Sequence, residues 1–237
     1  MSKKKLNILG IIPARGGSKE IKRKNLLKIG NKTLIEIAVK SVKESKYLTR
    51  TIFSTDDEEM YKLGRKLNVE VPFKRPKKFG SDKASIFSVV KHAVEWLKKN
   101  ENWDTDIIVL LQPTTPFRSA KHIDEVIKLL LRTKANSAIT IKKPDYPPHW
   151  MLKLDGDKKL SSLIRNGNKF LRRQDTPNIY QPAGLVFAFT KKLLYSLKTV
   201  LPSGDTRGFI VSEKEGINID TWEQYEMAKL FYEQSSK

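Results

Sequence analysis

Short apolar runs alternate with amphipathic helix patterns through roughly the first 140 of the chain's 237 residues. Brief runs that are apolar on both sides and bounded by polar turns are typical of buried strands. We expect strands at residues 6–12, 50–55, 69–73, 106–112 and 137–141, and helices at residues 33–45, 56–67, 85–100 and 121–132. Thr33 and Glu36 match a capping box at the start of the first helix. This order predicts an α/β domain with a doubly wound, mostly parallel sheet.

Residues 142–178 break the alternation. They are rich in Pro, Asp, Gly and Lys, and we interpret them as an insertion of short extended segments that forms an arm or a dimer contact. Regular structure is expected to return with a strand at residues 184–190, a short helix, and a closing helix from Trp222 to about Glu233. We therefore expect residues 1–237 to form a single domain, with an insertion at about residues 142–178.

The composition is strongly basic: 46 Lys and Arg against 26 Asp and Glu give a formal net charge of +20. Such an excess favours anionic partners, although a lysine-rich solvated surface explains many of these residues equally well. No helix-turn-helix, zinc or RNA-recognition signature accompanies the charge, so we expect no nucleic acid partner. The absence of cysteine excludes disulfides and thiolate metal sites. The first apolar run is too short for a signal peptide or a membrane span, which predicts a cytoplasmic protein without a membrane partner.

The loop "IIPARGGSKEIKRKN", residues 11–25, leaves the first expected strand with two adjacent glycines and five cationic side chains. The amides of Gly16, Gly17 and Ser18 can turn toward one point and bind a phosphate. Arg15 and Lys24 add full charges, and Lys19 is a weaker candidate. The spacing matches neither the Walker pattern nor G-x-G-x-x-G. A basic surface loop is the alternative interpretation of this stretch alone.

Other polar loops also follow expected strands. "STDD" and "QPTTPFR" come directly after residues 50–55 and 106–112, as "PARGGSK" does after residues 6–12. Ligands of doubly wound sheets bind at the carboxyl ends of the strands. These three loops should therefore gather at one edge and form a binding site.

Several ordered segments give a more specific indication. The first loop resembles the N-terminal signature of the acylneuraminate cytidylyltransferases, the CMP-sialic acid synthetase family. The later segments that resemble this family are "FSTDDEE", "RPKKFGSDKAS", "LLQPTTPFR", "RRQDTPNIYQPAG" and "GINIDTWEQYEMA". The resemblance covers nearly the whole chain. It implies a nucleotidyltransferase fold of Rossmann-like type and a homodimer whose arm provides the contact.

The resemblance also implies a reaction. Such an enzyme transfers CMP from CTP to the anomeric hydroxyl of a 2-keto sugar acid, a sialic-acid-like nonulosonate, and releases pyrophosphate with the help of Mg²⁺. The catalytic residues would be Arg15, Lys24 and Asp220. The nucleotide-binding residues would be Ala14, Arg15, Gly16, Gly17, Ser18, Lys24, Asn25, Arg75, Asp82 and Ser85. The sugar acid would be bound by Gln112, Arg173, Tyr180 and Gln181.

Some of these residues have competing interpretations. An alternative interpretation of Arg75 and Asp82 is an ion pair that merely holds a loop, and one of Arg118 is a structural ion-pair partner. None of the three histidines is at a position that indicates a general base.

The chain departs from the family pattern at two places. The metal-binding D-I-D segment is Asn218-Ile219-Asp220 here, so we expect Asp220 and a weaker Asn218 as ligands, because alternate residues of a strand face the same way. The alternative is a strand-end Asn and an Asp that caps the last helix. On the sugar side, Gln181 replaces an arginine and Ala183 replaces an asparagine. The identity of the acceptor acid is therefore left open: it is a sialate, a legionaminate, a pseudaminate, a 3-deoxy-manno-octulosonate or an aminophosphonate.

Overall fold

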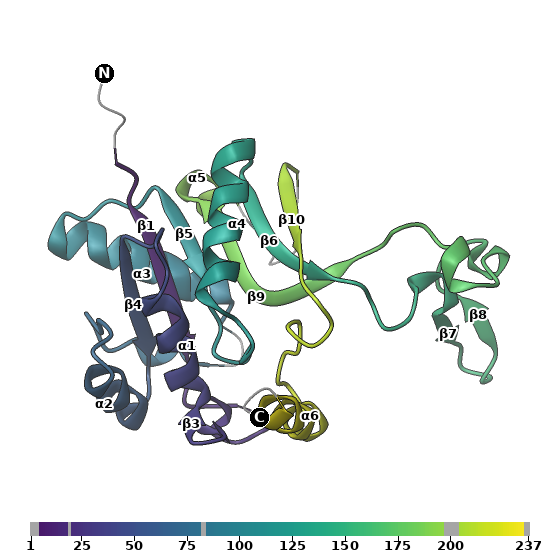
Figure 1. Ribbon diagram of the computed structural model, residues 1–237, viewed down its shortest axis with the longest axis horizontal. Coiled ribbons are helices and arrows are strands. Elements are labelled where there is room, and N and C mark those ends of the chain that lie inside the picture. Colours follow the sequence, from purple (N-terminus) through teal and green to yellow (C-terminus); the bar gives the residue numbers. More distant parts are fainter. Residues whose placement is uncertain (1–4, 19, 82–83, 197–203, 235–237) are drawn as a thin grey trace.

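The computed structural model describes residues 5–18, 20–81, 84–196 and 204–234. Among these residues a six-stranded sheet forms the centre of the molecule, in the order β10-β6-β9-β5-β1-β4 (Figure 1). Its strands are β1 (Ile8–Ala14), β4 (Arg50–Thr55), β5 (Ile107–Leu110), β6 (Ser137–Lys142), β9 (Gln181–Thr190) and β10 (Thr206–Ile210). All seven residues of β1 are buried, as expected for a strand covered on both faces.

The sheet is mostly parallel. β1 pairs in parallel with β4 and β5, and β10 pairs in parallel with β6. Only β9, among the strands of this sheet, runs antiparallel to both of its neighbours, β5 and β6. The predicted doubly wound α/β architecture is confirmed, and the carboxyl ends of β1, β4 and β5 lie at one edge.

Helices cover both faces of the sheet. The apolar stripes of α1 (Leu34–Lys43), α2 (Glu58–Lys66) and α4 (Ala120–Thr133) pack on one face, and those of α3 (Ile86–Glu101) and α5 (Lys191–Ser196) pack on the other. The capping box of α1 is present: Glu36 N donates to Thr33 Oγ1 over 3.2 Å, and Thr33 N donates to Glu36 Oε2 over 2.6 Å. No helix in the described ranges is long and apolar enough to cross a membrane.

Three local expectations differ from the structure. Residues 69–73 do not form a strand of the sheet, because Pro72 has no N–H to donate, and only Glu70 makes an isolated bridge to Ile52. Strand β10 was not predicted, because Arg207 and Gly208 interrupt its apolar character. A hairpin of β2 (Lys28–Ile29) and β3 (Lys32–Thr33) was also missed.

The closing helix α6 (Trp222–Gln234) is confirmed and builds a third apolar cluster. Ala228 of α6 packs with Ile217 and Ile219 of the preceding segment and with Ile21, Ile29 and Leu34 near the start of the chain. This cluster holds the segment that contains Asp220 against the loop that contains Lys24. Two residues that are 196 positions apart in sequence are thereby brought together.

Between β6 and β9 the chain leaves the sheet and forms an arm that projects from the body (Figure 1). The arm consists of an antiparallel hairpin, β7 (Leu152–Leu154) and β8 (Leu160–Ser162), and three short 3-10 turns, η3 (Pro148–Trp150), η4 (Gly167–Lys169) and η5 (Arg173–Asp175). Its apolar side chains are exposed: Leu154 by 68%, Leu160 by 59% and Leu171 by 84%. This surface is not covered by the rest of the chain as described.

Candidate active site

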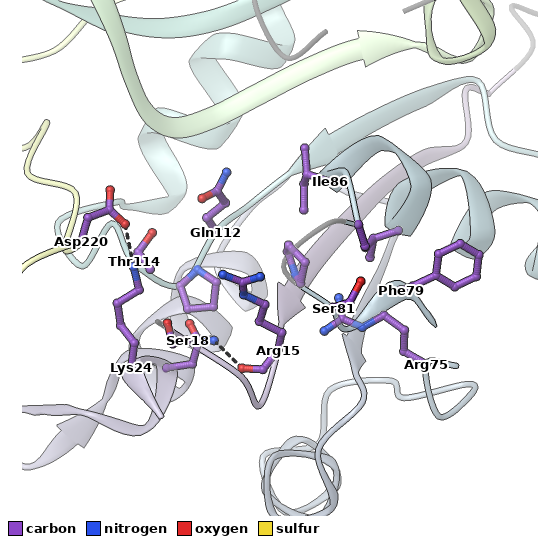
Figure 2. A pocket seen from close by; sticks show the side chains of 15 residues that line it. Arg15, Ser18, Lys24, Arg75, Phe79, Ser81, Ile86, Gln112, Thr114 and Asp220 are labelled. Carbon is purple, nitrogen blue, oxygen red and sulfur yellow. Dashed lines mark hydrogen bonds and ion pairs between the residues drawn. The ribbon is translucent and has the colours of Figure 1, made fainter. Parts of the chain in front are cut away.

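A cavity of about 270 Å³ lies at the carboxyl ends of β1 and β5 (Figure 2). The loops that follow these two strands meet there with η1 (Lys24–Leu26), with the segment around η2 (Lys77–Phe79) and with the start of α3. The polar residues that line it are Arg15, Ser18, Lys24, Asn25, Arg75, Ser81, Gln112, Thr114 and Asp220. The expected convergence of strand-end loops is thus present, and seven of these residues were candidates from the sequence.

The cavity has two chemically different ends. Figure 2 shows Lys24, Thr114 and Asp220 at one end and Phe79, Ser81 and Ile86 at the other, with Arg15 and Gln112 between them. Lys24, with Arg15 beside that end, favours phosphate oxygens, whereas the aromatic ring and small polar groups of the other end, next to the ion-paired Arg75, favour a flat heterocycle. The arrangement is suited to a nucleotide that lies along the cavity.

The first loop is anchored at both sides of Arg15. Asn25 is 7% exposed, and its Nδ2 donates to the carbonyl of Arg15 over 3.2 Å. The amide of Gly16 donates to Asp56 Oδ1 over 3.3 Å, so this amide is directed at a carboxylate of the chain itself. Apart from Gly17 and its chain neighbours, no described residue has an atom within 4 Å of the position that a Cβ on Gly17 would take, and Ser18 lines the cavity. Lys19 lies outside the described residues.

Arg75 is almost completely buried and joins two strand ends. Its Nη2 donates to Asp56 Oδ1 and to the carbonyl of Ala14, each over 2.8 Å. Burial lowers the pKa of Arg75, and the hydrogen bond that Arg75 donates to Asp56 opposes that shift. The ion pair that holds this segment therefore exists, but with Asp56, while Asp82 lies outside the described residues.

Ala14 and Ser85 do not line the cavity. Ala14 is the buried last residue of β1 and contributes its carbonyl to Arg75. Ser85 is the N-cap of α3, where its Oγ accepts from Ser88 N over 3.1 Å. Both residues position the walls of the cavity.

Asp220 is held by two donors. Lys24 Nζ lies 2.6 Å from Asp220 Oδ1, and Asn218 Nδ2 donates to Asp220 Oδ2 over 2.6 Å. The amide oxygen of Asn218 is buried and finds no hydrogen-bond partner among the described residues. The helix-cap interpretation of Asp220 is not supported, because the hydroxyl of Thr221 accepts from Gln224 N over 3.4 Å.

This donor set fits a divalent ion that is held mainly by a nucleotide. Asp220 offers a carboxylate and Asn218 offers an unpartnered amide oxygen, both of which are suitable oxygen ligands. The described residues contain no group of three or more His, Cys, Asp or Glu side chains that could hold a metal. The chain alone therefore supplies few ligands, and phosphate oxygens would complete the site.

Gln112 is positioned by a buried arginine. Arg118 donates to the carbonyl of Gln112 over 2.7 Å and to that of Leu185 over 3.1 Å. Burial lowers the pKa of Arg118 to about 9. No ion pair of Arg118 occurs among the described residues, so the expected ion-pair role is replaced by hydrogen bonds to carbonyl groups.

Three of the expected sugar-binding residues lie away from the cavity. Arg173, on the arm, donates to the carbonyl groups of Pro144 and Asp145 and lines a separate cavity of about 360 Å³ together with Lys143. Tyr180 is 38% exposed, and Gln181 is the first residue of β9. Within one chain the structure does not bring these residues together with Gln112.

Sequence reasoning did not identify Phe79, Ile86 or Asp56 as parts of the site. Phe79 lies within the resembling segment "RPKKFGSDKAS" and Ile86 directly follows it, so an aromatic residue in that segment was the available signal. Asp56 lies in "STDD", but its ion pair with Arg75 depends on how the two loops meet in the fold.

The family model described as Cytidylyltransferase matches residues 9–232. The chain belongs to the cytidylyltransferase family. It is therefore a nucleotidyltransferase enzyme. Cytidylyltransferases of this type generally use a divalent metal ion, which agrees with the donor set around Asp220.

Curated relatives extend the resemblance. This cytidylyltransferase is 28% identical over 222 residues to the N-acylneuraminate cytidylyltransferase of Escherichia coli O18:K1:H7, a match that covers 93% of the chain and 51% of the relative. It thus spans about half the length of that protein. It is 27% identical to the pseudaminic acid cytidylyltransferase of Campylobacter jejuni, with 94% of the chain and 95% of the relative covered. A CMP-N,N'-diacetyllegionaminic acid synthase of Legionella pneumophila is 25% identical, with 91% and 92% covered.

Solved structures support the fold. A CMP:2-keto-3-deoxy-manno-octonic acid synthetase complexed with CTP superposes with a TM-score of 0.71 at 16% identity, covering 97% of the chain and 99% of that structure. A 4-diphosphocytidyl-2C-methyl-D-erythritol synthase from Anaerococcus prevotii gives a TM-score of 0.65 at 19% identity, with 96% of each chain covered. Both likenesses are to nucleotidyltransferase-type α/β folds.

The segment before Asp220 is fixed to α4 through His122. His122 Nδ1 accepts from Ser119 N over 3.1 Å, and its Nε2 lies 3.2 Å from Glu215 Oε1. Burial lowers the pKa of His122, Arg118 and Lys121 lower it further, and Glu215 opposes them. The ring is therefore neutral in the folded protein at pH 7, with its proton on Nε2.

Stability should consequently depend on pH through His122. The folded pKa is depressed below the unfolded value of 6.5, so the unfolded chain binds the proton more readily as pH falls through that value. The free energy of unfolding should decrease from pH 7 to pH 5.5, and His122→Gln should make this decrease smaller. Urea denaturation of both proteins at the two pH values measures it. An equal decrease in both would mean that His122 is not the responsible group.

Proposed function

We propose that this cytidylyltransferase transfers CMP from CTP to the anomeric hydroxyl of a 2-keto sugar acid of the sialic-acid-like nonulosonate class, releasing pyrophosphate. The observation that carries the proposal is one cavity with Lys24 at one end, Phe79 and Ser81 at the other, and Arg15 between them. The relatives named for neuraminate, pseudaminate and legionaminate support the class of acid.

In the proposed reaction the acceptor hydroxyl attacks the α-phosphorus of CTP in line with the departing pyrophosphate. A bond forms between the acceptor oxygen and the α-phosphorus. The bond between the α-phosphorus and the oxygen that bridges to the β-phosphate breaks, and the hydroxyl proton leaves to solvent. Arg15 and Lys24 offset the charge that accumulates on the pyrophosphate. Gln112, whose backbone is held by Arg118, would orient the acceptor through its side-chain amide. None of the histidines is among the residues that line the cavity, so we assign none of them as a base.

We propose Mg²⁺ as the divalent ion, with Asp220 and Asn218 as its ligands from the chain. When bound, the ion would supply further neutralisation of the phosphate charge. Lys24 now contacts Asp220 Oδ1, and a triphosphate offers Lys24 a more highly charged partner. The approach of the phosphates would therefore release the carboxylate.

The acceptor is tested by a panel of acids, with pyrophosphate release as the readout. We expect the highest kcat/KM with a nonulosonate such as a sialate, a legionaminate or a pseudaminate. Turnover with an octulosonate or an aminophosphonate alone would change the class of acid but keep cytidylyl transfer. If none of the acids causes pyrophosphate release from CTP, and the protein binds random DNA at ~0.2 M salt, a nucleic acid partner is favoured instead.

Loss of either cation of the first loop should impair the reaction. Arg15→Ala and Lys24→Ala should each lower kcat/KM for CTP by about 100-fold or more, because an aimed donor contributes on that scale to a developing negative charge. Lys22→Ala is the matched control, since Lys22 is exposed and does not line the cavity. Near wild-type rates in both test variants would remove the loop from the phosphate site.

The metal requirement should follow the charge of residues 218 and 220. Asp220→Asn should nearly abolish activity, because no carboxylate remains in that segment. Asn218→Asp should lower the Mg²⁺ concentration that gives half the maximal rate, because a second carboxylate binds the ion more strongly. Rates measured against Mg²⁺ concentration compare the three proteins. If Asp220→Asn keeps the full rate and the same midpoint, Asp220 is not a ligand.

We further propose that residues 1–237 act as one catalytic domain and that the arm, about residues 142–178, pairs two chains. Burial of the exposed apolar side chains of the projecting hairpin against a second chain would be favourable. Arg173 lies at the base of this arm. A partner's Arg173 would then complete the sugar site that one chain leaves incomplete. We expect this CTP-dependent reaction to take place in the cytoplasm, where nucleoside triphosphates are available.

Light scattering at micromolar concentration should give the mass of two chains. Leu160→Glu should shift the mass toward that of one chain, because a charge would be buried in the contact. Leu230→Glu is the control, since Leu230 is an equally exposed leucine on α6. A wild-type protein that has the mass of one chain would contradict the proposed dimer.

A further inference from the structure

Asp56 lies at the point where the two walls of the nucleotide cavity meet. It directly follows β4, and its Oδ1 accepts from Arg75 Nη2 over 2.8 Å and from Gly16 N over 3.3 Å. Arg75 belongs to the segment at the Phe79 end of the cavity, and Gly16 belongs to the loop that contains Arg15. A single carboxylate oxygen thus connects both walls.

Two glycines permit this close approach. A Cβ on Gly80 would lie 2.2 Å from Asp56 Oδ2 and 2.6 Å from Asp56 Cγ, so any side chain there would displace the carboxylate or the segment. A Cβ on Gly16 would lie 2.9 Å from Oδ2 of the neighbouring Asp57. Neither glycine has a positive φ. Their small size, not their backbone freedom, is what these positions require.

The buried guanidinium of Arg75 also requires the negative charge of Asp56. The side chain of Arg75 is 3% exposed and that of Asp56 is 17% exposed, so the pair is largely removed from water. The charge of Arg15 further disfavours the charged form of Arg75 and lowers its pKa. A buried cation that loses its carboxylate is strongly destabilised and moves toward solvent or another anion.

We infer that Asp56 is a positioning residue for the nucleotide: it fixes the separation between residues 15–18 of the first loop and the segment of residues 75–81. It does not line the cavity and acts through Gly16 and Arg75. This inference rests on the proposed function, in which CTP bridges those two walls. Loss of the connection weakens CTP binding and leaves the affinity for the acceptor acid nearly unchanged.

The test is the Kd of CTP, measured by calorimetry on the full chain, together with separate KM values for CTP and the acid. Asp56→Ala should raise the Kd of CTP by about tenfold or more, which is the scale of a lost hydrogen bond between charged groups. Asp56→Asn, which keeps an acceptor oxygen, should recover part of this loss. Gly80→Ala should raise the Kd without a change of charge.

Gly64→Ala is the matched control. A Cβ on Gly64 would lie 2.8 Å from Phe53 Cδ1, so this variant strains the core as Gly80→Ala strains the site, but away from the cavity. It should lower the melting temperature and leave the Kd of CTP unchanged. An unchanged Kd in Asp56→Ala and Gly80→Ala, or an equal rise in the KM for the acid, would overturn the inference. A wild-type protein that binds no CTP would instead overturn the proposed function.

Discussion

The site depends on holding like charges together. Arg15, Lys24 and Arg75 line one small cavity, and such a group repels itself unless carboxylates are placed nearby. Asp56 lies against Arg75 and Asp220 lies against Lys24, at 2.8 Å and 2.6 Å. The two carboxylates differ in exposure, since the side chain of Asp56 is 17% exposed and that of Asp220 is 56% exposed. The buried pair is suited to a permanent structural role, and the exposed pair is suited to exchange with a ligand.

Two features of the packing bring these groups to the site. The parallel order of β1, β4 and β5 directs three loops to one edge, where Arg15, Asp56 and Gln112 follow their strands. The apolar cluster around Ile217, Ile219 and Ala228 then brings the Asp220 segment to the same edge from the far end of the chain. Neither step requires the site residues to interact with each other first. Burial of apolar side chains therefore supplies the energy that assembles a cationic site.

Much of this could be predicted from local patterns. The capping box of Thr33 and Glu36, the apolar runs of β1 and β5, and the glycines after β1 are signals contained in a few consecutive residues. The partners of the buried arginines could not be predicted in the same way. The sequence suggested Asp82 as an acidic partner of Arg75, and the pairing of Arg75 with Asp56 depends on how close Gly80 lets two loops come. Arg118 resembled an ion-pair partner but is bound by carbonyl groups, which no charge pattern indicates.

In the proposed reaction CTP lies along the cavity with its phosphates at the Lys24 end. A crystal structure with CTP and Mg²⁺ tests it most directly. We predict that the triphosphate contacts Arg15 and Lys24, that Lys24 has left Asp220, and that the cytosine lies beside Phe79 and Ser81. A cytosine beside Lys24, or a CTP molecule bound outside this cavity, would contradict this placement of the nucleotide.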